Sequence, residues 1–318
     1  MRAFVSATSF LKPQNAEAQK ELNAFFDSVI YNELGVPLQG EQILERLDGC
    51  DAYLAGVDYI TADVIERMPA SVKVISRYGV GVDRVDLAAA EKRGIVVTNT
   101  PGANATSVCE LAFALILCAA RDVPQLHNAV TRGEWPRSEG IELAGRTLGI
   151  VGLGAIGKRL AIRARAFEMK VLAYDPFFDE AFASANDVVR ADLDEVFRRA
   201  DVVSLHLPLN ETTRHLVDAK RIREMKDGAI LINAARGGLI EEQAAADALK
   251  SGKLGGLGLD AFEQEPLLQS PLKGLPHVVF TPHTGAHTGE AVARMGLMSV
   301  RNAIAVLRGE PCSYIVRK

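Results

Sequence analysis

Residues 148–157 read Leu148-Gly149-Ile150-Val151-Gly152-Leu153-Gly154-Ala155-Ile156-Gly157, and they say more about the fold than any other part of this 318-residue sequence. The first four residues predict a buried strand, and residues 158–167 continue after the glycines with a helical pattern. Glycines spaced as G-x-G-x-x-G between a strand and a helix are typical of a βαβ unit that binds a dinucleotide. The stretch therefore predicts an α/β architecture built outward from this unit.

Each glycine of this loop has a physical task. Gly152 permits a tight turn, Gly154 lets the backbone approach a pyrophosphate, and Gly157 lets the helix pack close to the strand. Ala155 and Ile156 lie at the positive N-terminus of the helix, where the phosphates are expected.

A P-loop is the alternative phosphate-binding motif, because Lys158 follows the last glycine. A P-loop needs Ser or Thr at the next position to hold magnesium, and this chain has Arg159 there. The dinucleotide interpretation is therefore favoured.

The choice between the two nicotinamide dinucleotides depends on Asp175, which ends the next predicted strand, Lys170–Tyr174. A carboxylate at this place accepts hydrogen bonds from a ribose diol and repels a 2′-phosphate, so the sequence predicts NAD as the cofactor. The alternative is that Asp175 only shapes a turn before Pro176.

Short apolar runs alternate with helical patterns along nearly the whole chain, which predicts two parallel sheets covered by helices. One run of units lies before a long helix expected over residues 104–131, and a second run follows it. The first run predicts strands at Ala3–Val5, Asp51–Ala55, Lys73–Ser76 and Ile95–Thr98, with helices at Glu41–Leu47, Thr61–Met68 and Val85–Arg93. The second predicts further strands at Thr147–Val151, Val188-Val189, Asp201–His206, Ala229–Asn233, Gly255–Leu259 and His277–Phe280.

The last amphipathic stretch, Glu290–Leu307, is expected to pack back on the first sheet. The first domain is then discontinuous, with residues 1–100 plus 288–318 binding the substrate. Residues 101–287 form the second, NAD-binding domain.

The composition excludes several classes of protein. The net charge of −4 and the absence of a basic stripe argue against nucleic acid as a partner, and no apolar run is long enough to span a membrane. No secretory signal opens the chain, and the four cysteines form no C-x-x-C pair. We therefore expect a cytoplasmic protein with reduced cysteines.

Polar side chains follow three consecutive predicted strands of the second domain. Arg236 follows the first of them, Asp260 and Glu265 follow the next, and His283 follows the last. Parallel strands bring their carboxyl ends to one edge, where α/β sites form. An arginine can bind a carboxylate with two hydrogen bonds, a histidine can carry a proton near neutral pH, and a glutamate can orient the imidazole. This set suits the reduction of a 2-keto acid, and each member alone could instead be structural.

A metal site is not expected. His287 lies four residues after His283, but no cysteine or acidic cluster completes a ligand set nearby. His206, at another strand end, either lines the cofactor site or is structural.

With these motifs the chain resembles the D-isomer-specific 2-hydroxyacid dehydrogenases, over nearly its whole length. The shared motifs are the glycine loop, His206–Thr213, Asn233–Ile240, Leu259–Pro266 and Pro282-His283. The resemblance implies a flavodoxin-like substrate domain, a Rossmann NAD domain, a cleft between them and a homodimer formed through the NAD domains. It also implies that Arg236, Glu265 and His283 are the catalytic residues.

The same resemblance implies the remaining site residues. Further contacts to NAD are expected from Leu207, Pro208, Thr213, Ala234, Asp260 and Gly285. Arg77, Tyr78, Gly79 and Val80, together with Arg236, are expected to bind a small anionic 2-hydroxy or 2-keto acid.

Within the family the chain looks most like phosphoglycerate dehydrogenases that lack a regulatory domain. It departs from them at Gly56, where such enzymes usually offer an arginine to the phosphate, and at His287, which replaces a small residue. The alternatives are a glyoxylate or hydroxypyruvate reductase and, in a different class, an NAD-sensing corepressor-like protein without enzymatic activity.

Overall fold

The computed structural model describes residues 1–317, which form two units. Unit 1 comprises residues 1–104 and the described residues from 286 onward, and unit 2 comprises residues 105–285. Each unit contains one sheet in which all strand pairs are parallel. The predicted fold class, two doubly wound α/β units, is confirmed.

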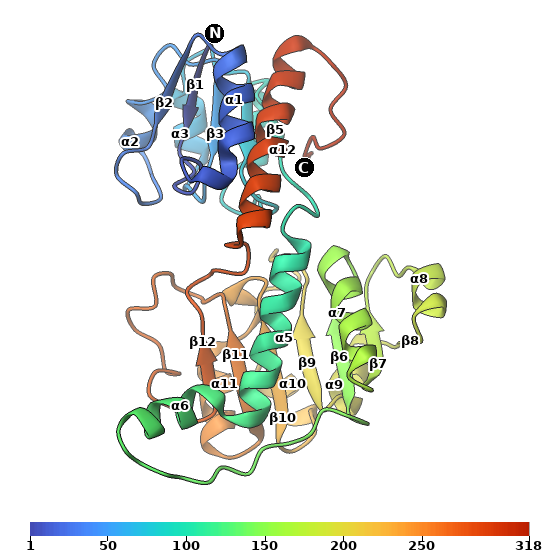
Figure 1. The fold of residues 1–318 in the computed structure, drawn as a ribbon. Coiled ribbons are helices and arrows are strands. Elements are labelled where there is room, and N and C mark those ends of the chain that lie inside the picture. Colours follow the sequence, from blue (N-terminus) through green and yellow to red (C-terminus); the bar gives the residue numbers. More distant parts are fainter. Residues whose placement is uncertain (318) are drawn as a thin grey trace. The chain divides into compact units, whose positions relative to one another are not determined.

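The sheet of unit 1 has the strand order β2-β1-β3-β4-β5, which is the flavodoxin-like order (Figure 1). Its strands are β1 (Arg2–Val5), β2 (Ser28–Tyr31), β3 (Ala52–Ala55), β4 (Val74–Arg77) and β5 (Val96–Thr98). One face packs against α2 (Glu41–Leu44), α3 (Ala62–Arg67) and α4 (Leu87–Lys92). The other packs against α1 (Ala16–Phe25) and α12 (Gly289–Arg308), which lie side by side. The short helix η1 (Pro13–Asn15) precedes α1 and also contacts α12.

Two elements of unit 1, β2 and α1, were not expected from the sequence. β2 is an edge strand with no fully buried residue, and α1 buries only Ala18 and Leu22. Their apolar patterns are too weak to stand out without the rest of the unit.

The sheet of unit 2 has the strand order β12-β11-β10-β9-β6-β7-β8. The strands are β6 (Thr147–Val151), β7 (Lys170–Tyr174), β8 (Val188–Arg190), β9 (Val202–Leu205), β10 (Ala229–Asn233), β11 (Leu254–Leu259) and β12 (Val278–Phe280). The chain order reverses between β6 and β9, and this reversal creates the crevice in which Rossmann folds bind their dinucleotide.

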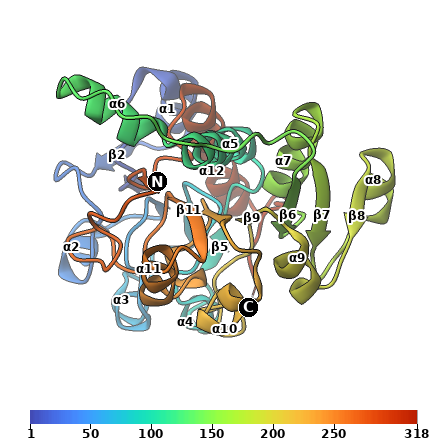
Figure 2. The same ribbon diagram turned by 90° about the horizontal axis from the view of Figure 1, so that it is seen from below.

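Helices cover both faces of this second sheet (Figure 2). One layer contains α5 (Ala105–Arg121), α7 (Ala155–Ala166) and α8 (Glu180–Ala185), and the other contains α9 (Leu193–Arg199), α10 (Ala219–Glu224) and α11 (Glu242–Lys250). The short helix η2 (Gly237–Leu239) follows β10. Apolar side chains from both sheet faces fill the two cores, so the central strands β6, β9, β10 and β11 are largely buried, whereas the edge strand β8 is mostly exposed.

The single long helix expected over residues 104–131 is wrong. The chain forms α5 and then a separate helix, α6 (Val123–Thr131), with Asp122 between them in a left-handed conformation at φ 50°. Pro124 lies in the first turn of α6, where proline is tolerated, and it cannot supply the N–H that a continuous helix needs. Asp122 is buried and accepts hydrogen bonds from Ser138 Oγ and from His277 Nδ1, which stabilises the break.

Candidate active site

The candidate site lies at the carboxyl edge of the second sheet. Asn233, Leu259 and Phe280 end β10, β11 and β12, and they are register partners across the three strands. The loops that follow therefore leave the sheet at one level, and they carry Arg236, Glu265 and His283. The expectation that these loops share an edge is confirmed by the strand order.

His283 and Glu265 are in direct contact. Nδ1 of His283 lies 2.8 Å from Oε1 of Glu265, and the N–H of Phe262 donates to the same carboxylate oxygen at 3.3 Å. An ionised carboxylate can only accept hydrogen bonds, so this contact places the imidazole proton on Nδ1. Nε2 is then the nitrogen that can exchange a proton with a ligand.

The His283 loop is shaped by the buried carboxylate of Asp260. Oδ1 accepts hydrogen bonds from Thr281 Oγ1 at 2.6 Å and from the N–H of Thr284 at 2.8 Å, and Oδ2 accepts one from the N–H of Gly285 at 2.8 Å. Asp260 thus binds residues on both sides of His283. These hydrogen bonds hold His283 itself in a left-handed conformation at φ 52°, which residues other than glycine rarely adopt.

Arg236 is half-buried, and its loop is held from two sides. The buried side chain of Asn233 accepts from the N–H of Ala235 at 3.0 Å and donates to the carbonyl of Arg236 at 2.8 Å. On the other side, a methyl group on Gly237 would lie 1.8 Å from the carbonyl carbon of Phe262. Only glycine permits this approach, so the Arg236 loop packs directly on the loop that carries Glu265.

The glycine loop has the conformation that its sequence predicts. Gly152 has φ 104°, and a side chain there would meet the backbone of His206 at 2.7 Å. A methyl group on Gly157 would lie 2.2 Å from the carbonyl oxygen of Gly152, so α7 packs tightly on the turn. Gly154, by contrast, has open space beside it at the start of α7. Because the first N–H groups of a helix have no partner within it, this arrangement fits a bound pyrophosphate.

Asp175 shapes the turn that the sequence offered as one alternative, and it also binds the glycine loop. Its Oδ1 accepts from the N–H of Phe177 at 2.7 Å, which shapes the turn around Pro176. Its Oδ2 accepts from the N–H of Leu153 at 2.7 Å, so the carboxylate also fixes the glycine loop. Each carboxylate oxygen can accept a further hydrogen bond, and a ribose diol fits this acceptor.

His206 follows β9, next to the glycine loop. Burial lowers the pKa of its imidazole from 6.5 to about 4, so the ring is neutral at physiological pH. Nε2 lies 2.9 Å from Ser204 Oγ, and the buried Nδ1 has no hydrogen-bond partner among the described residues. The structure therefore places His206 as a neutral ring beside the crevice.

The other residues expected to contact NAD lie in the same loops. Leu207 and Ala234 are buried, Pro208 is exposed, and Thr213 Oγ1 donates to the carbonyl of Pro208 at 2.7 Å. Gly285 accepts a hydrogen bond from Ser107 Oγ of α5. These contacts stabilise the loops around the crevice.

Apart from Arg236, the residues expected to bind the substrate acid lie in unit 1, where Arg77 ends β4 and residues 78–80 follow it. The side chain of Tyr78 is buried and donates from its hydroxyl to the carbonyl of Val292 at 2.8 Å. Arg77 is also buried, and its guanidinium donates to the carbonyls of Ala55 at 2.8 Å and Gly81 at 3.0 Å. Both side chains thus support the loop from inside.

The carbonyl groups of the same loop are also bonded to unit 1. The carbonyl of Gly79 accepts from the N–H of Thr100 at 3.0 Å, and that of Val80 accepts from Asn99 Nδ2 at 2.8 Å. Gly79 itself has φ 151°, which favours glycine. Asn99 and Thr100 thus fix the backbone of the loop that follows β4.

Sequence reasoning missed Glu242, the first residue of α11. Its side chain is buried and accepts hydrogen bonds from the N–H of Glu263 and from Ser270 Oγ. An acidic residue in the first turn of a helix is common for electrostatic reasons alone, so no local pattern pointed to these contacts.

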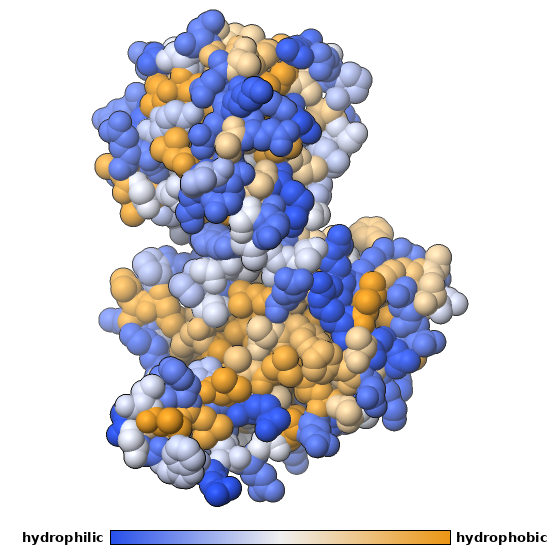
Figure 3. All heavy atoms as spheres, in the orientation of Figure 1, coloured by the Kyte–Doolittle hydropathy of each residue, from blue (hydrophilic) through white to orange (hydrophobic). Residues whose placement is uncertain are grey.

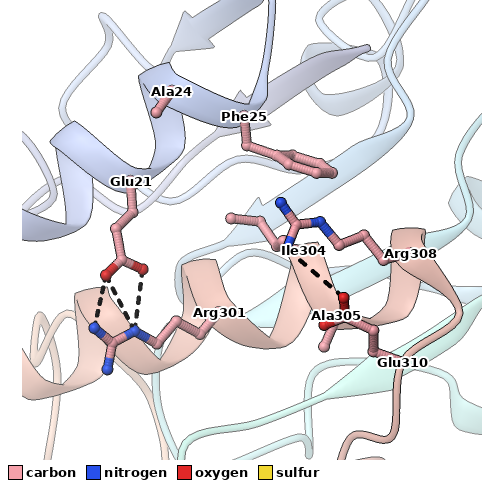
Figure 4. A pocket seen from close by; sticks show the side chains of 8 residues that line it. All are labelled: Glu21, Ala24, Phe25, Arg301, Ile304, Ala305, Arg308 and Glu310. Atoms are coloured by element: carbon pink, nitrogen blue, oxygen red, sulfur yellow. Dashed lines mark hydrogen bonds and ion pairs between the residues drawn. The ribbon is translucent and has the colours of Figure 1, made fainter.

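A groove in unit 1 lies between α1 and α12, and it contains none of the predicted site residues (Figure 4). Arg301 bridges it to Glu21 at 2.6 Å, and Arg308 lies over the ring of Phe25. Within residues 1–317 no three His, Cys, Asp or Glu side chains are grouped to hold a metal, and no helix is long and apolar enough to cross a membrane.

Comparison with known proteins identifies the family. Residues 113–285 match the model of the D-isomer specific 2-hydroxyacid dehydrogenase, NAD binding domain. The chain is 43% identical over 288 residues to a D-3-phosphoglycerate dehydrogenase of Methanocaldococcus jannaschii, covering 89% of this chain and 55% of that one. The chain thus spans about half the length of the phosphoglycerate dehydrogenases that it matches.

Other relatives match over most of their length. A hydroxypyruvate reductase of Thermotoga maritima is 45% identical over 243 residues, covering 75% of this chain and 78% of that one. The crystal structure of a glyoxylate reductase from Paecilomyes thermophila superposes with a TM-score of 0.88 at 30% identity, covering 99% of this chain and 98% of that one. The resemblance noted from the motifs is therefore confirmed: the chain belongs to the family of D-isomer-specific 2-hydroxyacid dehydrogenases.

Proposed function

We propose that this protein is an NAD-dependent dehydrogenase that transfers hydride between nicotinamide and C2 of a small D-2-hydroxy or 2-keto acid. The observation that carries the proposal is the 2.8 Å contact between His283 and Glu265, beside the loop of Arg236. The combination of a proton carrier, its carboxylate partner and a fixed cation matches what the reduction of a keto acid requires.

Each of the three side chains has a distinct role in this proposal. Arg236 binds the carboxylate of the acid and polarises the ketone, and its positive charge cannot be lost. His283 gives a proton from Nε2 to the developing alkoxide, or takes it from the hydroxyl in the reverse direction. Glu265 accepts from Nδ1, which orients the ring so that Nε2 is available to the acid.

NAD is proposed to bind at the crevice of unit 2. The pyrophosphate would lie against Gly154, Ala155 and Ile156 at the start of α7, and Asp175 would accept the ribose hydroxyls. Leu207, Pro208, Thr213, Ala234, Asp260 and Gly285 are proposed to line the rest of the cofactor site. When bound, the nicotinamide supplies or accepts the hydride.

The loop after β4 is proposed to bind the acid mainly through its backbone. Arg77 is engaged with one carbonyl at the end of β3 and one in its own loop, and the carbonyls of Gly79 and Val80 are bonded to Thr100 and Asn99. This leaves the N–H groups of residues 79–81 as donors to an anion. Unit 1 would thus contribute substrate binding, and unit 2 cofactor binding and proton transfer.

We further propose that the protein is a cytoplasmic homodimer. Apolar side chains gather over α5 on one face of unit 2 (Figure 3), and Trp135, which follows α6, is 80% exposed. A face of this kind commonly marks a protein interface. All four cysteines are free, which fits a reducing compartment.

The test of the proposed activity is an NADH-oxidation screen over 2-keto acids of graded size and charge. Glyoxylate and hydroxypyruvate are expected to be reduced, because relatives are named for these activities. Binding of NADH without turnover of any acid would instead support the NAD-sensing alternative.

A further inference from the structure

The peptide between Phe262 and Glu263 joins the elements of the candidate site. Gly237, next to Arg236, approaches this peptide so closely that a methyl group would lie 2.0 Å from the carbonyl oxygen of Phe262. The N–H of Phe262, which belongs to the preceding peptide, donates to Glu265, and Glu265 contacts His283. A shift of Phe262 would therefore displace both the arginine loop and the histidine–glutamate pair.

Glu242 holds this peptide from the side of α11. Its Oε1 accepts from the N–H of Glu263 at 2.9 Å, and its Oε2 accepts from Ser270 Oγ at 2.6 Å. The side chain is 6% exposed, so its charge is withdrawn from water and needs these partners. The two oxygens thus bind both ends of the segment 263–270, which includes Glu265.

The side chain of Glu263 makes a separate and weaker contact. Its carboxylate lies 2.8 Å from Nε2 of His215, and both side chains are more than one-third exposed. Exposed ion pairs contribute little to the stability of a loop. The backbone at Glu263 is therefore held mainly by its hydrogen bond to the buried Glu242, which we call the Glu242 tether.

We propose that Glu242 is a positioning residue for the reaction, and that it acts by holding the Phe262–Glu263 peptide so that Glu265 stays in contact with His283. The kinetic part of this inference rests on the proposed function. The structural part does not, because the tether to Glu263 is a property of the folded chain.

The kinetic test compares Glu242→Ala with Glu242→Gln and with Gln243→Ala, a matched control on the exposed side of the same helix. Glu242→Ala is expected to lower kcat for keto-acid reduction by about ten- to a hundredfold, since small displacements of reacting groups have such effects. The Kd of NADH should change less than twofold, because the glycine loop is not touched. Glu242→Gln should restore most of kcat, because its amide oxygen accepts from Glu263 and its NH₂ group donates to Ser270.

A double-mutant cycle distinguishes positioning from general destabilisation. If Glu242 acts through Glu265, the Glu242→Ala change should have little further effect on kcat in a Glu265→Ala background. Losses that multiply in the double variant would overturn the proposal, and so would an equal loss in Gln243→Ala. If Glu242→Ala does not fold, Ser270→Ala removes one of the two bonds and should lower kcat in the same direction; an unchanged kcat would then reject the proposal.

Hydrogen exchange provides a readout that does not depend on turnover. The segment 262–270 should exchange faster in Glu242→Ala and normally in Glu242→Gln, and unchanged exchange in the alanine variant would reject the tether. The two proposals can also be told apart. If the wild-type protein reduces no keto acid but the segment 262–270 still exchanges faster in Glu242→Ala than in the wild type, the proposed function has failed while the structural role of Glu242 holds.

Discussion

Arg236 is positioned by its own loop before any ligand binds. Asn233 shapes the turn from within, Gly237 lets it pack on Phe262, and the guanidinium donates from Nη1 to the carbonyl of Ala235 at 2.8 Å. A planar guanidinium held in this way can offer two parallel donors to a carboxylate, which a lysine cannot.

Replacement of Arg236 tests this geometry. We expect Arg236→Ala to lower kcat/KM for the keto acid by about 10²–10³-fold, since a fixed donor to developing charge is lost. Arg236→Lys should recover little, because one ammonium cannot reproduce the fork. Steady-state kinetics with saturating NADH measure the effect, and a lysine variant with near-normal turnover would reject the role.

The contact between Glu265 and His283 predicts that the carboxylate fixes the orientation of the ring. Glu265→Ala leaves Nδ1 without this acceptor, so Nε2 is no longer held in one direction, and kcat for keto-acid reduction should fall by about ten- to a hundredfold. Glu265→Gln keeps an acceptor oxygen and should lose less. Steady-state kinetics with saturating NADH measure both effects, and an alanine variant with unchanged kcat would mean that the two groups do not act together.

The buried ring of His206 predicts how stability depends on pH. Its folded pKa is lowered to about 4 by burial, so between pH 6.5 and pH 4 the unfolded chain binds a proton that the folded chain does not. Stability is therefore lost as the pH falls through this window, by about 2 kcal/mol between pH 7.5 and pH 5. His206→Gln should lose correspondingly less free energy of unfolding in urea titrations at these two pH values, and an equal loss would show that the ring titrates normally.

Among the secondary-structure elements, the first turn of α7 and the end of β7 act together. Asp175 follows β7 and accepts from Leu153 in the glycine loop, so the residue proposed to select the cofactor also fixes the loop proposed to bind its phosphates. A change at Asp175 should therefore affect affinity as well as selectivity.

Asp175→Ser tests both consequences. We expect kcat/KM for NADH to fall by about ten- to a hundredfold, which corresponds to one charge-assisted hydrogen bond. The loss for NADPH should be smaller, because repulsion of the 2′-phosphate disappears, and a basic residue added nearby should narrow the preference further. A wild-type enzyme that used both cofactors equally would contradict the role of Asp175.

At the scale of the whole molecule, the packing around Gly56 bears on which acid the protein is proposed to bind. Gly56, after β3, lies so close to the loop after β1 that a methyl group there would be 3.1 Å from Cα of Ala7. A larger residue at this position would have to displace backbone, so the glycine fits the tight packing of the two loops. Where the resemblance to phosphoglycerate dehydrogenases leads one to expect an arginine, this chain thus has a close backbone contact.

Substrate preference is the corresponding prediction. A phosphate that lacks one charged partner loses about 1.5–3 kcal/mol, or roughly ten- to a hundredfold in affinity. We therefore expect good activity with glyoxylate or hydroxypyruvate and weaker use of 3-phosphohydroxypyruvate. The measurement is kcat/KM for hydroxypyruvate and for its phosphate ester with saturating NADH. A preference of a hundredfold or more for the ester would show that other cations hold the phosphate.

The amino-acid sequence alone determined the fold class, the strands next to the candidate site and the three polar residues proposed to act there. The strands β6, β7, β9, β10 and β11 are buried along most of their length, so their apolar runs stand out, and β6, β7 and β10 begin and end where the sequence predicts. Arg236, Glu265 and His283 could be named because each follows a predicted strand, and parallel strands leave little freedom in where their ends lie.

Only the tertiary structure decided the features that depend on contacts between distant segments. The break at Asp122 is stabilised by His277 and Ser138, and the role of Glu242 depends on Glu263 and Ser270. Local sequence patterns predict apolar periodicity and turns, but they do not predict which buried carboxylate contacts which distant loop. That information arises when packing brings the segments together, because a buried charge must then find its partners.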